Sequence, residues 1–270
     1  GSTIGGGTFN TATGAASTIG GGSSNQATMN RATVSGGQQN IAAGENATVA
    51  GGFDNQANGR GSFTVGEQNR AEGNFSVAIG QLNMATGSAA TIGGGSSNSA
   101  SAPRTTVAGG QNNASSADSA TIGGGFNNIA GGTGATVPGG IGNEASGDSS
   151  LAGGNRATAA GTASLAFGQS ANAVGSYSVA LGRRANANAE GAFCWADSTD
   201  ADFIAGTNQF WARASGGFFM STVPAGNMGA ILTGGSGSWV AISDRDAQED
   251  IAPVDAQAVR EKVANRPNSD

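Results

Sequence analysis

The chain has 270 residues, of which 49 are glycine and 11% are charged, and its formal net charge is −6. Its twelve basic residues are scattered, which argues against a nucleic-acid or an anionic-membrane partner. It has no histidine and one cysteine, Cys194, so an intrachain disulfide, a cysteine metal cluster and a histidine base are excluded. We therefore expect no metal, no cofactor and no enzymatic activity.

The glycines lack the three-residue period of collagen, and the chain is poorer in charge and proline than disordered chains are. They indicate positions of positive φ or of close backbone approach. The chain shows no signal peptide and no apolar run near twenty residues. Because it begins within a repeat pattern, we expect a fragment of a longer protein, with no membrane insertion in this part.

An apolar residue recurs every 14 or 15 residues through most of the chain. A register held this long predicts a repeat fold. These anchors favour strands, and the glycines after them disfavour a helix. We expect the anchors to fill the core of the repeat: Ile4, Ile19, Val34, Val49, Val77, Ile92, Val107, Ile122, Val137, Leu151, Leu165 and Val179, with Phe63 and a degenerate Phe193 at the same spacing.

An asparagine follows each of the first ten anchors by six residues. Asparagine tolerates the left-handed backbone of a turn and can hydrogen-bond its own local backbone, so the column predicts structural turn residues. Alternatively, the side chains form an inward ladder of stacked amides. Neither interpretation makes the column a ligand site. Its members are Asn10, Asn25, Asn40, Asn55, Asn69, Asn83, Asn98, Asn113, Asn128 and Asn143.

This pattern predicts an all-β fold, a parallel β-solenoid of 14–15-residue coils with two short strands in each coil. Stacked coils pair backbone to backbone, so each coil satisfies the hydrogen bonds of its neighbours. The interior of such a coil holds little apolar volume against the entropy of ordering the backbone, about 1–2 kcal/mol per residue. We therefore expect homo-oligomerisation along the solenoid axis.

The segments Ser164–Gly168 (SLAFG) and Ser178–Gly182 (SVALG) resemble the head repeats of YadA-like trimeric autotransporter adhesins. The Thr-Ile-Gly-Gly-Gly units are similar to a variant of that repeat, and the resemblance covers about residues 3–190. It implies a left-handed parallel β-roll over residues 1–191, a homotrimer, and display on the bacterial cell surface beyond the outer membrane.

The composition changes near Ala192, and all three tryptophans lie beyond it. Phe203–Ala205, Gln209–Arg213 and Gly217–Met220 predict short strands separated by turn residues. We expect residues 192–242 to form a β-rich trimeric connector. A tryptophan-lined ligand groove is the alternative.

Residues 235–251 resemble the entry to the endosialidase-type intramolecular chaperone domain, a family that trimerises and cleaves itself. The resemblance implies that Ser243 is the cleavage nucleophile, but Gln248 stands where the family has its lysine base. We therefore assign no catalytic residue and treat residues 243–270 as a truncated chaperone-like segment. Asp255 predicts the start of a short helix over residues 256–264.

These observations predict a structural and adhesive segment of a trimeric autotransporter, which attaches multivalently to a host or extracellular-matrix receptor. A phage tail-fibre or tailspike segment is one alternative, based on the chaperone-like entry. An ice-binding solenoid is another, based on a threonine before many anchors. A solenoid glycan hydrolase is less consistent with the chain, because no pair of carboxylates recurs in the repeats.

Overall fold

The computed structural model describes residues 1–221 and 229–242, and these contain no helix. The helix expected over residues 256–264 lies outside the described residues, as do Ser243 and Gln248. The chain divides into two units, Gly1–Arg213 and Ala214–Asp270, and each is described here by itself.

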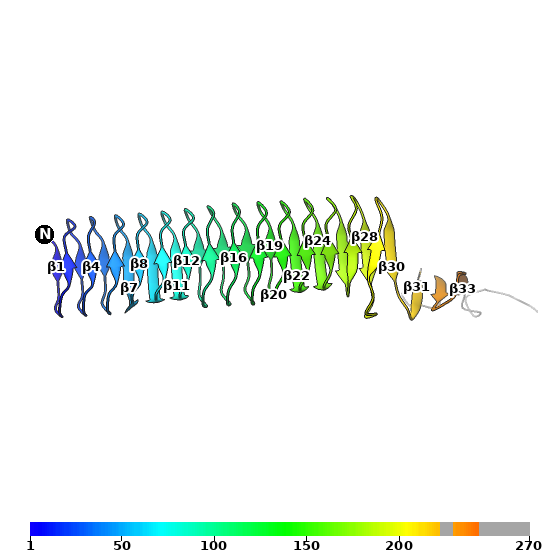
Figure 1. The fold of residues 1–270 in the computed structure, drawn as a ribbon, viewed down its shortest axis with the longest axis horizontal. Coiled ribbons are helices and arrows are strands. Elements are labelled where there is room, and N and C mark those ends of the chain that lie inside the picture. The colour runs from blue at the N-terminus through cyan, green and yellow to red at the C-terminus, as the bar shows by residue number, and fades with distance from the viewer. Residues whose placement is uncertain (222–228, 243–270) are drawn as a thin grey trace, which may run out of the picture. The chain divides into compact units, whose positions relative to one another are not determined.

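The first unit is a parallel β-solenoid of stacked coils, which confirms the expected fold class (Figure 1). Its odd-numbered and even-numbered early strands form two sheets, called sheet A and sheet B. Sheet A contains β1 (Thr3–Ile4), β3 (Thr18–Ile19), β5 (Thr33–Val34), β7 (Thr48–Phe53), β9 (Phe63–Glu67), β11 (Val77–Gln81), β13 (Thr91–Ile92), β15 (Thr106–Val107), β17 (Thr121–Ile122), β19 (Thr136–Val137), β20 (Gly140–Ile141), β22 (Leu151–Asn155), β24 (Leu165–Gln169), β26 (Val179–Gly182), β28 (Phe193–Ala196) and β30 (Phe210–Arg213). Sheet B contains β2 (Thr11–Ala12), β4 (Gln26–Ala27), β6 (Ile41–Ala42), β8 (Gln56–Ala57), β10 (Arg70–Ala71), β12 (Met84–Ala85), β14 (Ser99–Ala100), β16 (Ala114–Ser115), β18 (Ile129–Ala130), β21 (Glu144–Ala145), β23 (Thr158–Ala159), β25 (Asn172–Ala173), β27 (Ala185–Ala187) and β29 (Phe203–Ala205).

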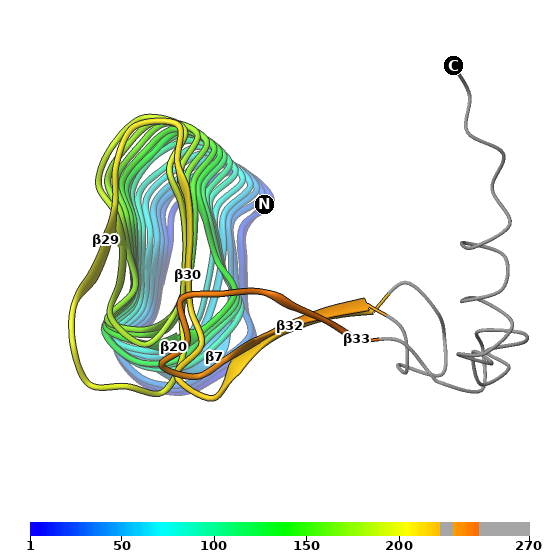
Figure 2. The ribbon, with the colours of Figure 1, turned by 90° about the vertical axis from the view of Figure 1, so that its right-hand side faces the viewer.

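Each strand of the solenoid pairs with strands one coil away. Thr121 and Ile122 of β17, for example, pair with Thr136 and Val137 of β19. Strands of two residues suffice because every coil lies between two others and hydrogen-bonds to both. Viewed along the stack, the coils superpose as one flattened loop, with the two sheets on its long sides (Figure 2).

The core of the solenoid is built from small columns. In a typical coil, Ala120 and Ile122 are fully buried from the sheet A side, and Asn128 and Ala130 are fully buried from the sheet B side. Ile19, Val34, Val49, Ile92, Val107 and Val137 lie in the column of Ile122 and are also fully buried. Ile4 occupies the same column in the first coil, where it is 45% exposed.

The 14-residue and 15-residue coils differ in length at one place. It lies between the inward residue of the sheet A strand and the buried asparagine or alanine just before the sheet B strand. Six residues separate Ile92 from Asn98, whereas five separate Ala78 from Asn83. Most of the longer coils hold the extra residue in a glycine stretch after a two-residue strand. The exception is the six-residue strand β7, in which the extra residue appears as a register shift between Val49 and Gly52. The shorter coils run through as strands of four or five residues, such as β11 and β24.

This difference corrects part of the expected core. In register, Val77 pairs with Thr91 and Ala78 pairs with Ile92. Val77 therefore lies on the outer side of its strand, half-buried, and Ala78 fills the core. Phe63, Leu151, Leu165, Val179 and Phe193 are shifted outward in the same way, and Thr64, Ala152, Ala166, Ala180 and Cys194 take the inward positions.

The solenoid also extends beyond residue 191, where we expected the head repeats to end. β28 and β30 continue sheet A, and β29 continues sheet B, so that stacking persists to Arg213. The predicted strands at Phe203–Ala205 and Gln209–Arg213 are thus the last strands of the solenoid. In the second unit, β31 (Gly217–Ser221), β32 (Gly229–Thr233) and β33 (Val240–Ile242) form an antiparallel sheet.

Candidate interaction surfaces

The asparagine column forms a buried ladder inside the solenoid. Asn128 donates through Nδ2 to the carbonyl oxygens of Gly124 and Gly140, each at 2.9 Å. Its Oδ1 accepts the backbone N–H of Asn143 one coil later, also at 2.9 Å. The other ladder members from Asn25 to Asn143 are at most 1% exposed and have equivalent bonds. Each ladder side chain therefore hydrogen-bonds to the backbone of its own coil and of the next coil, and the ladder offers no group to a ligand.

The left-handed backbone at this corner belongs to the residue before each asparagine. Asn127 has a φ of 57°, and Leu82 has a φ of 55°. The expectation that the ladder asparagines themselves adopt the left-handed conformation of a turn is therefore wrong. The alternative, an inward ladder of amides, is the observed arrangement. Each buried side chain also hydrogen-bonds to a local carbonyl oxygen four residues earlier, as Asn83 does to Ile79 and Asn128 to Gly124.

The outer face of sheet A consists of the residues that flank each inward residue of that sheet. In the 15-residue coils these are mostly threonine and a small residue, as in Thr121 and Gly123. In the 14-residue coils they are bulky and apolar, as in Val77 and Ile79, except for Gly153 in β22. Through β1 to β30, this face carries no charged side chain in either flanking position.

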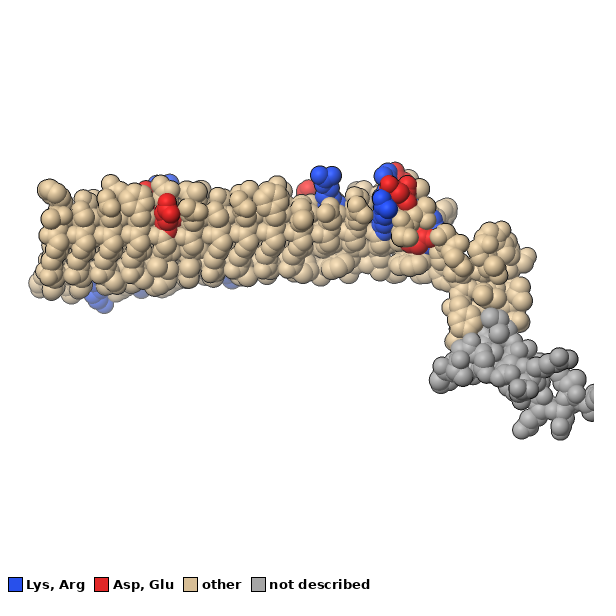
Figure 3. All heavy atoms as spheres, turned by 90° about the horizontal axis from the view of Figure 1, so that it is seen from below, with Lys and Arg blue, Asp and Glu red and all other residues tan. Residues whose placement is uncertain are grey.

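Most charged side chains of the solenoid lie at its corners and on sheet B, and Glu67 and Arg213 lie at the C-terminal ends of the sheet A strands β9 and β30. Arg31 pairs with Glu45, and Arg104 pairs with Asp118, in each case across adjacent coils at the same corner. Both pairs are exposed, so each contributes little to stability. Figure 3 shows one face of the solenoid, on which charged side chains are sparse and gather toward its C-terminal end.

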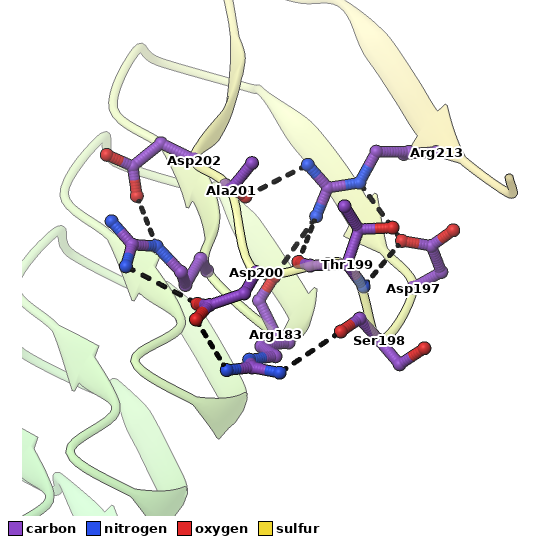
Figure 4. Close-up of polar contacts among 9 residues, drawn as sticks. Arg183, Asp197, Ser198, Thr199, Asp200, Ala201, Asp202 and Arg213 are labelled. Atoms are coloured by element: carbon purple, nitrogen blue, oxygen red, sulfur yellow. Dashed lines mark hydrogen bonds and ion pairs between the residues drawn. The ribbon is translucent and has the colours of Figure 1, made fainter.

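That C-terminal gathering surrounds the loop of residues 197–202, called the clamp loop below (Figure 4). Arg213 donates from Nε to Asp197 Oδ1 at 3.1 Å, with both side chains largely buried. Its two terminal nitrogens donate to the carbonyl oxygens of Ala201 at 2.9 Å and Thr199 at 3.0 Å. Arg213 thus holds the loop at three points.

Two further arginines pair with the remaining carboxylates of the clamp loop. Arg183 lies 2.8 Å from Asp200, and Arg184 donates to Asp202 at 2.9 Å. The hydrogen bond and charge of Arg184 lower the pKa of Asp202, and Asp202 raises the pKa of Arg184 in return. Every carboxylate of the loop is therefore paired with an arginine, which makes this cluster a structural tie.

Aromatic side chains fill the last coil. Phe203 stands in the column that asparagine or alanine occupies in earlier coils, and Trp211 follows Cys194 in the inward column of sheet A. Their rings lie 5.6 Å apart, and the Arg213 guanidinium lies 5.1 Å from the Phe203 ring. The Cys194 thiol donates to the Phe203 carbonyl oxygen, and burial raises its pKa. These groups close the core at the end of the stack.

The residues that the structure describes hold no group of three histidine, cysteine, aspartate or glutamate side chains able to bind a metal ion. None of their elements is a helix long and apolar enough to cross a membrane. Ser243 and Gln248, the pair from the self-cleavage resemblance, lie outside the described residues.

Four segments of the chain match the YadA head domain repeat. They are residues 57–83, 145–171, 159–185 and 173–193, and they fall on the 14-residue coils. The resemblance to the YadA-like head of trimeric autotransporter adhesins is supported over these residues. The match does not extend to the proposed connector or to the chaperone-like segment. Among curated proteins, none matches the chain.

Sequence reasoning missed the inward residues of the 14-residue coils. A signal for them is present two positions earlier, in the buried column of Ala120. Ser62, Ser76, Ser150, Ser164 and Ser178 belong to that column, and the residue two positions after each of them faces inward. Aligning the repeats on this small residue instead of the bulkiest one gives the observed register.

Proposed function

We propose that the chain is a structural and adhesive segment of a cell-surface trimeric autotransporter adhesin. The observation that carries this proposal is the match to the YadA head domain repeat within a regular parallel solenoid. In this proposal, three identical chains wind as left-handed rolls about one axis and stand on the bacterial surface. The chain has no catalytic role.

The mechanism is multivalent attachment. The outward positions of sheet B vary from coil to coil: they include Gln56, Arg70, Met84, Ile129 and Glu144. A repeated scaffold with variable outward positions presents many shallow contacts, and linked weak contacts gain overall affinity without any single strong site. A host-surface or extracellular-matrix molecule is the partner that we propose.

A binding array of glycans and matrix proteins, probed with the purified full chain, tests this role. We expect binding that weakens sharply when the chain is made monomeric, because the avidity of linked sites is then lost. Binding that is equally strong for monomer and oligomer would contradict multivalent attachment. Immunolabelling of intact cells tests the surface location: labelling only after permeabilisation would contradict it.

The outer threonines of sheet A support a second candidate, an ice-binding surface. Thr91, Thr106, Thr121 and Thr136 pair in register on successive strands and form an aligned row. Only one threonine per coil lies in this row, and the bulky residues of the 14-residue coils interrupt it. Thermal hysteresis of the purified chain decides between the candidates, because an adhesin segment is expected to show none.

A further inference from the structure

The branched apolar side chain changes sides between the two kinds of coil. In the 15-residue coil of β17, Ile122 points into the core, and Thr121 and Gly123 lie outside. In the 14-residue coil of β11, Ala78 points into the core, and Val77 and Ile79 lie outside. A long coil therefore buries the large apolar group of its sheet A strand within its own chain. A short coil places its large apolar groups on the outer face of sheet A: two each in the coils of β9, β11, β24 and β26, and one, Leu151, in the coil of β22.

The short coils are clustered, so their outward groups form two apolar patches. The first patch comprises Phe63, Val65, Val77 and Ile79, which pair across β9 and β11. The second comprises Leu151, Leu165, Phe167, Val179 and Leu181, on β22, β24 and β26. Phe167 is 46% exposed and its ring lies over Gly153. Between the patches, β13 to β19 expose threonine beside glycine, alanine or proline.

The charge distribution identifies copies of the same chain as the occupant of this face. In a parallel assembly about an axis along the solenoid, each residue near the axis meets its own copies. A charge there would face like charges, which is costly in a poorly solvated interface. The two positions that flank each inward residue of sheet A carry no charge along the whole stack. The charged residues of sheet A strands, Glu67 and Arg213, stand at strand ends, and sheet B and the corners carry many more charges.

We propose that the two apolar patches are the principal contacts that hold the chains of the homotrimer together, and that the 15-residue coils between them are spacers with self-contained cores. This inference rests on the proposed homotrimer and specifies where its cohesion resides. Coil length thus determines whether a coil stabilises its own chain or the assembly.

Disulfide trapping tests which face is shared. Ile79→Cys places a thiol in the first patch, and Met84→Cys places one on the outer side of sheet B, where Met84 is 42% exposed. Cys194 is buried and contributes no background reaction. Under oxidation we expect a covalent dimer for Ile79→Cys and none for Met84→Cys. Cross-linking of Met84→Cys alone would overturn the proposal, because the chains would then share the other face.

Loss of apolar side chains tests the division into patches and spacers. The double variant Val77→Ser/Ile79→Ser is compared with Thr106→Ser/Ala108→Ser on the spacer and with Ile129→Ser on sheet B. We expect the patch variant to raise the dissociation constant of the trimer by about 100-fold or more, and each control to change it by less than about threefold. Equal effects in the patch and the spacer would overturn the inference.

Light scattering of the unaltered chain separates this failure from a failure of the proposed function. A monomeric unaltered chain would refute the homotrimer itself. A trimeric unaltered chain whose patch variant remains equally trimeric would refute only the placement of its cohesion. Circular dichroism of each variant confirms that the solenoid is folded, and the single variant Ile79→Cys supplies the test if the double variant does not fold.

Discussion

Replacing one ladder asparagine by alanine is expected to destabilise the solenoid well beyond the loss of a surface amide. Asn55 is fully buried, and its Nδ2 donates to the carbonyl oxygens of Gly51 at 3.1 Å and Gly66 at 2.6 Å. Its Oδ1 accepts the backbone N–H of Asn69 at 3.1 Å. Asn55→Ala removes these bonds and leaves the buried N–H of Asn69 without that acceptor.

The magnitude follows from these contacts. Each lost hydrogen bond contributes about 1 kcal/mol net, and a buried group left unpaired costs about 1–3 kcal/mol. For Asn55→Ala we therefore expect a loss of about 3–5 kcal/mol in the free energy of unfolding. Because coils interact with their nearest neighbours, the loss should be greatest in the coils around Asn55.

Hydrogen exchange measured by mass spectrometry, together with chemical unfolding, checks this expectation. The matched control is Asn58→Ala, which removes an exposed asparagine from the same coil. We expect faster exchange in peptides that contain Asn55 and Asn69 for Asn55→Ala, and a change within about 0.5 kcal/mol for the control. Equal effects of the two substitutions would refute the ladder as the source of this stability.

Three further predictions follow from single residues of the solenoid. Thr64→Val should stabilise the solenoid by about 1–2 kcal/mol, because the buried Thr64 hydroxyl has no hydrogen-bond partner. The control Thr105→Val removes a hydrogen-bonded hydroxyl and should destabilise the solenoid. Thermal unfolding of both variants checks these two signs. Gly95→Ala should lower the free energy of unfolding by at least about 2 kcal/mol. A Cβ at Gly95 would collide with the backbone of the next coil, and the φ of 82° is unfavourable for alanine. Gly94→Ala is the control for denaturant unfolding and should change little, because a Cβ there meets open space. Arg213→Gln should open the clamp loop, at a cost of about 2 kcal/mol, and accelerate its hydrogen exchange while exchange elsewhere in the solenoid is unchanged.

The solenoid could be predicted from the sequence because its signal is periodic. A spacing of 14 or 15 residues that is held from Ile4 onward leaves few folds other than stacked coils. The prediction places Ile122 and Val137 in the core correctly, because in the long coils the branched residue of the two-residue sheet A strand is also the inward residue. The end of the array was harder to predict, since the aromatic residues near Phe203 hide the continuing register.

The inward residues of the short coils were predicted wrongly, and the reason is physical. Alternation fixes which residues share a side of a strand, but it does not say which side faces the core. In Val77-Ala78-Ile79, the larger residues suggested an inward position for Val77, yet the interior of a narrow coil accommodates Ala78. Val77 and Ile79 face outward, and this placement is favourable only if another chain covers the outer face of sheet A and removes these side chains from water.

The asparagine column shows a related limit. Composition indicates that asparagine suits a left-handed corner, and such a corner exists, but Asn127 occupies it rather than Asn128. The position next to a turn and the turn itself differ by one residue, and only the hydrogen bonds of the stacked coils distinguish them.

Sedimentation equilibrium of the full chain tests the central claim most directly. The chain has a mass of 25.9 kDa, so a homotrimer has a mass of three times that value, about 78 kDa. We predict the trimeric mass for the unaltered chain at micromolar concentration, and a shift toward the single-chain mass for Val77→Ser/Ile79→Ser. A single-chain mass for the unaltered protein would contradict the assembly on which the proposed adhesive function depends.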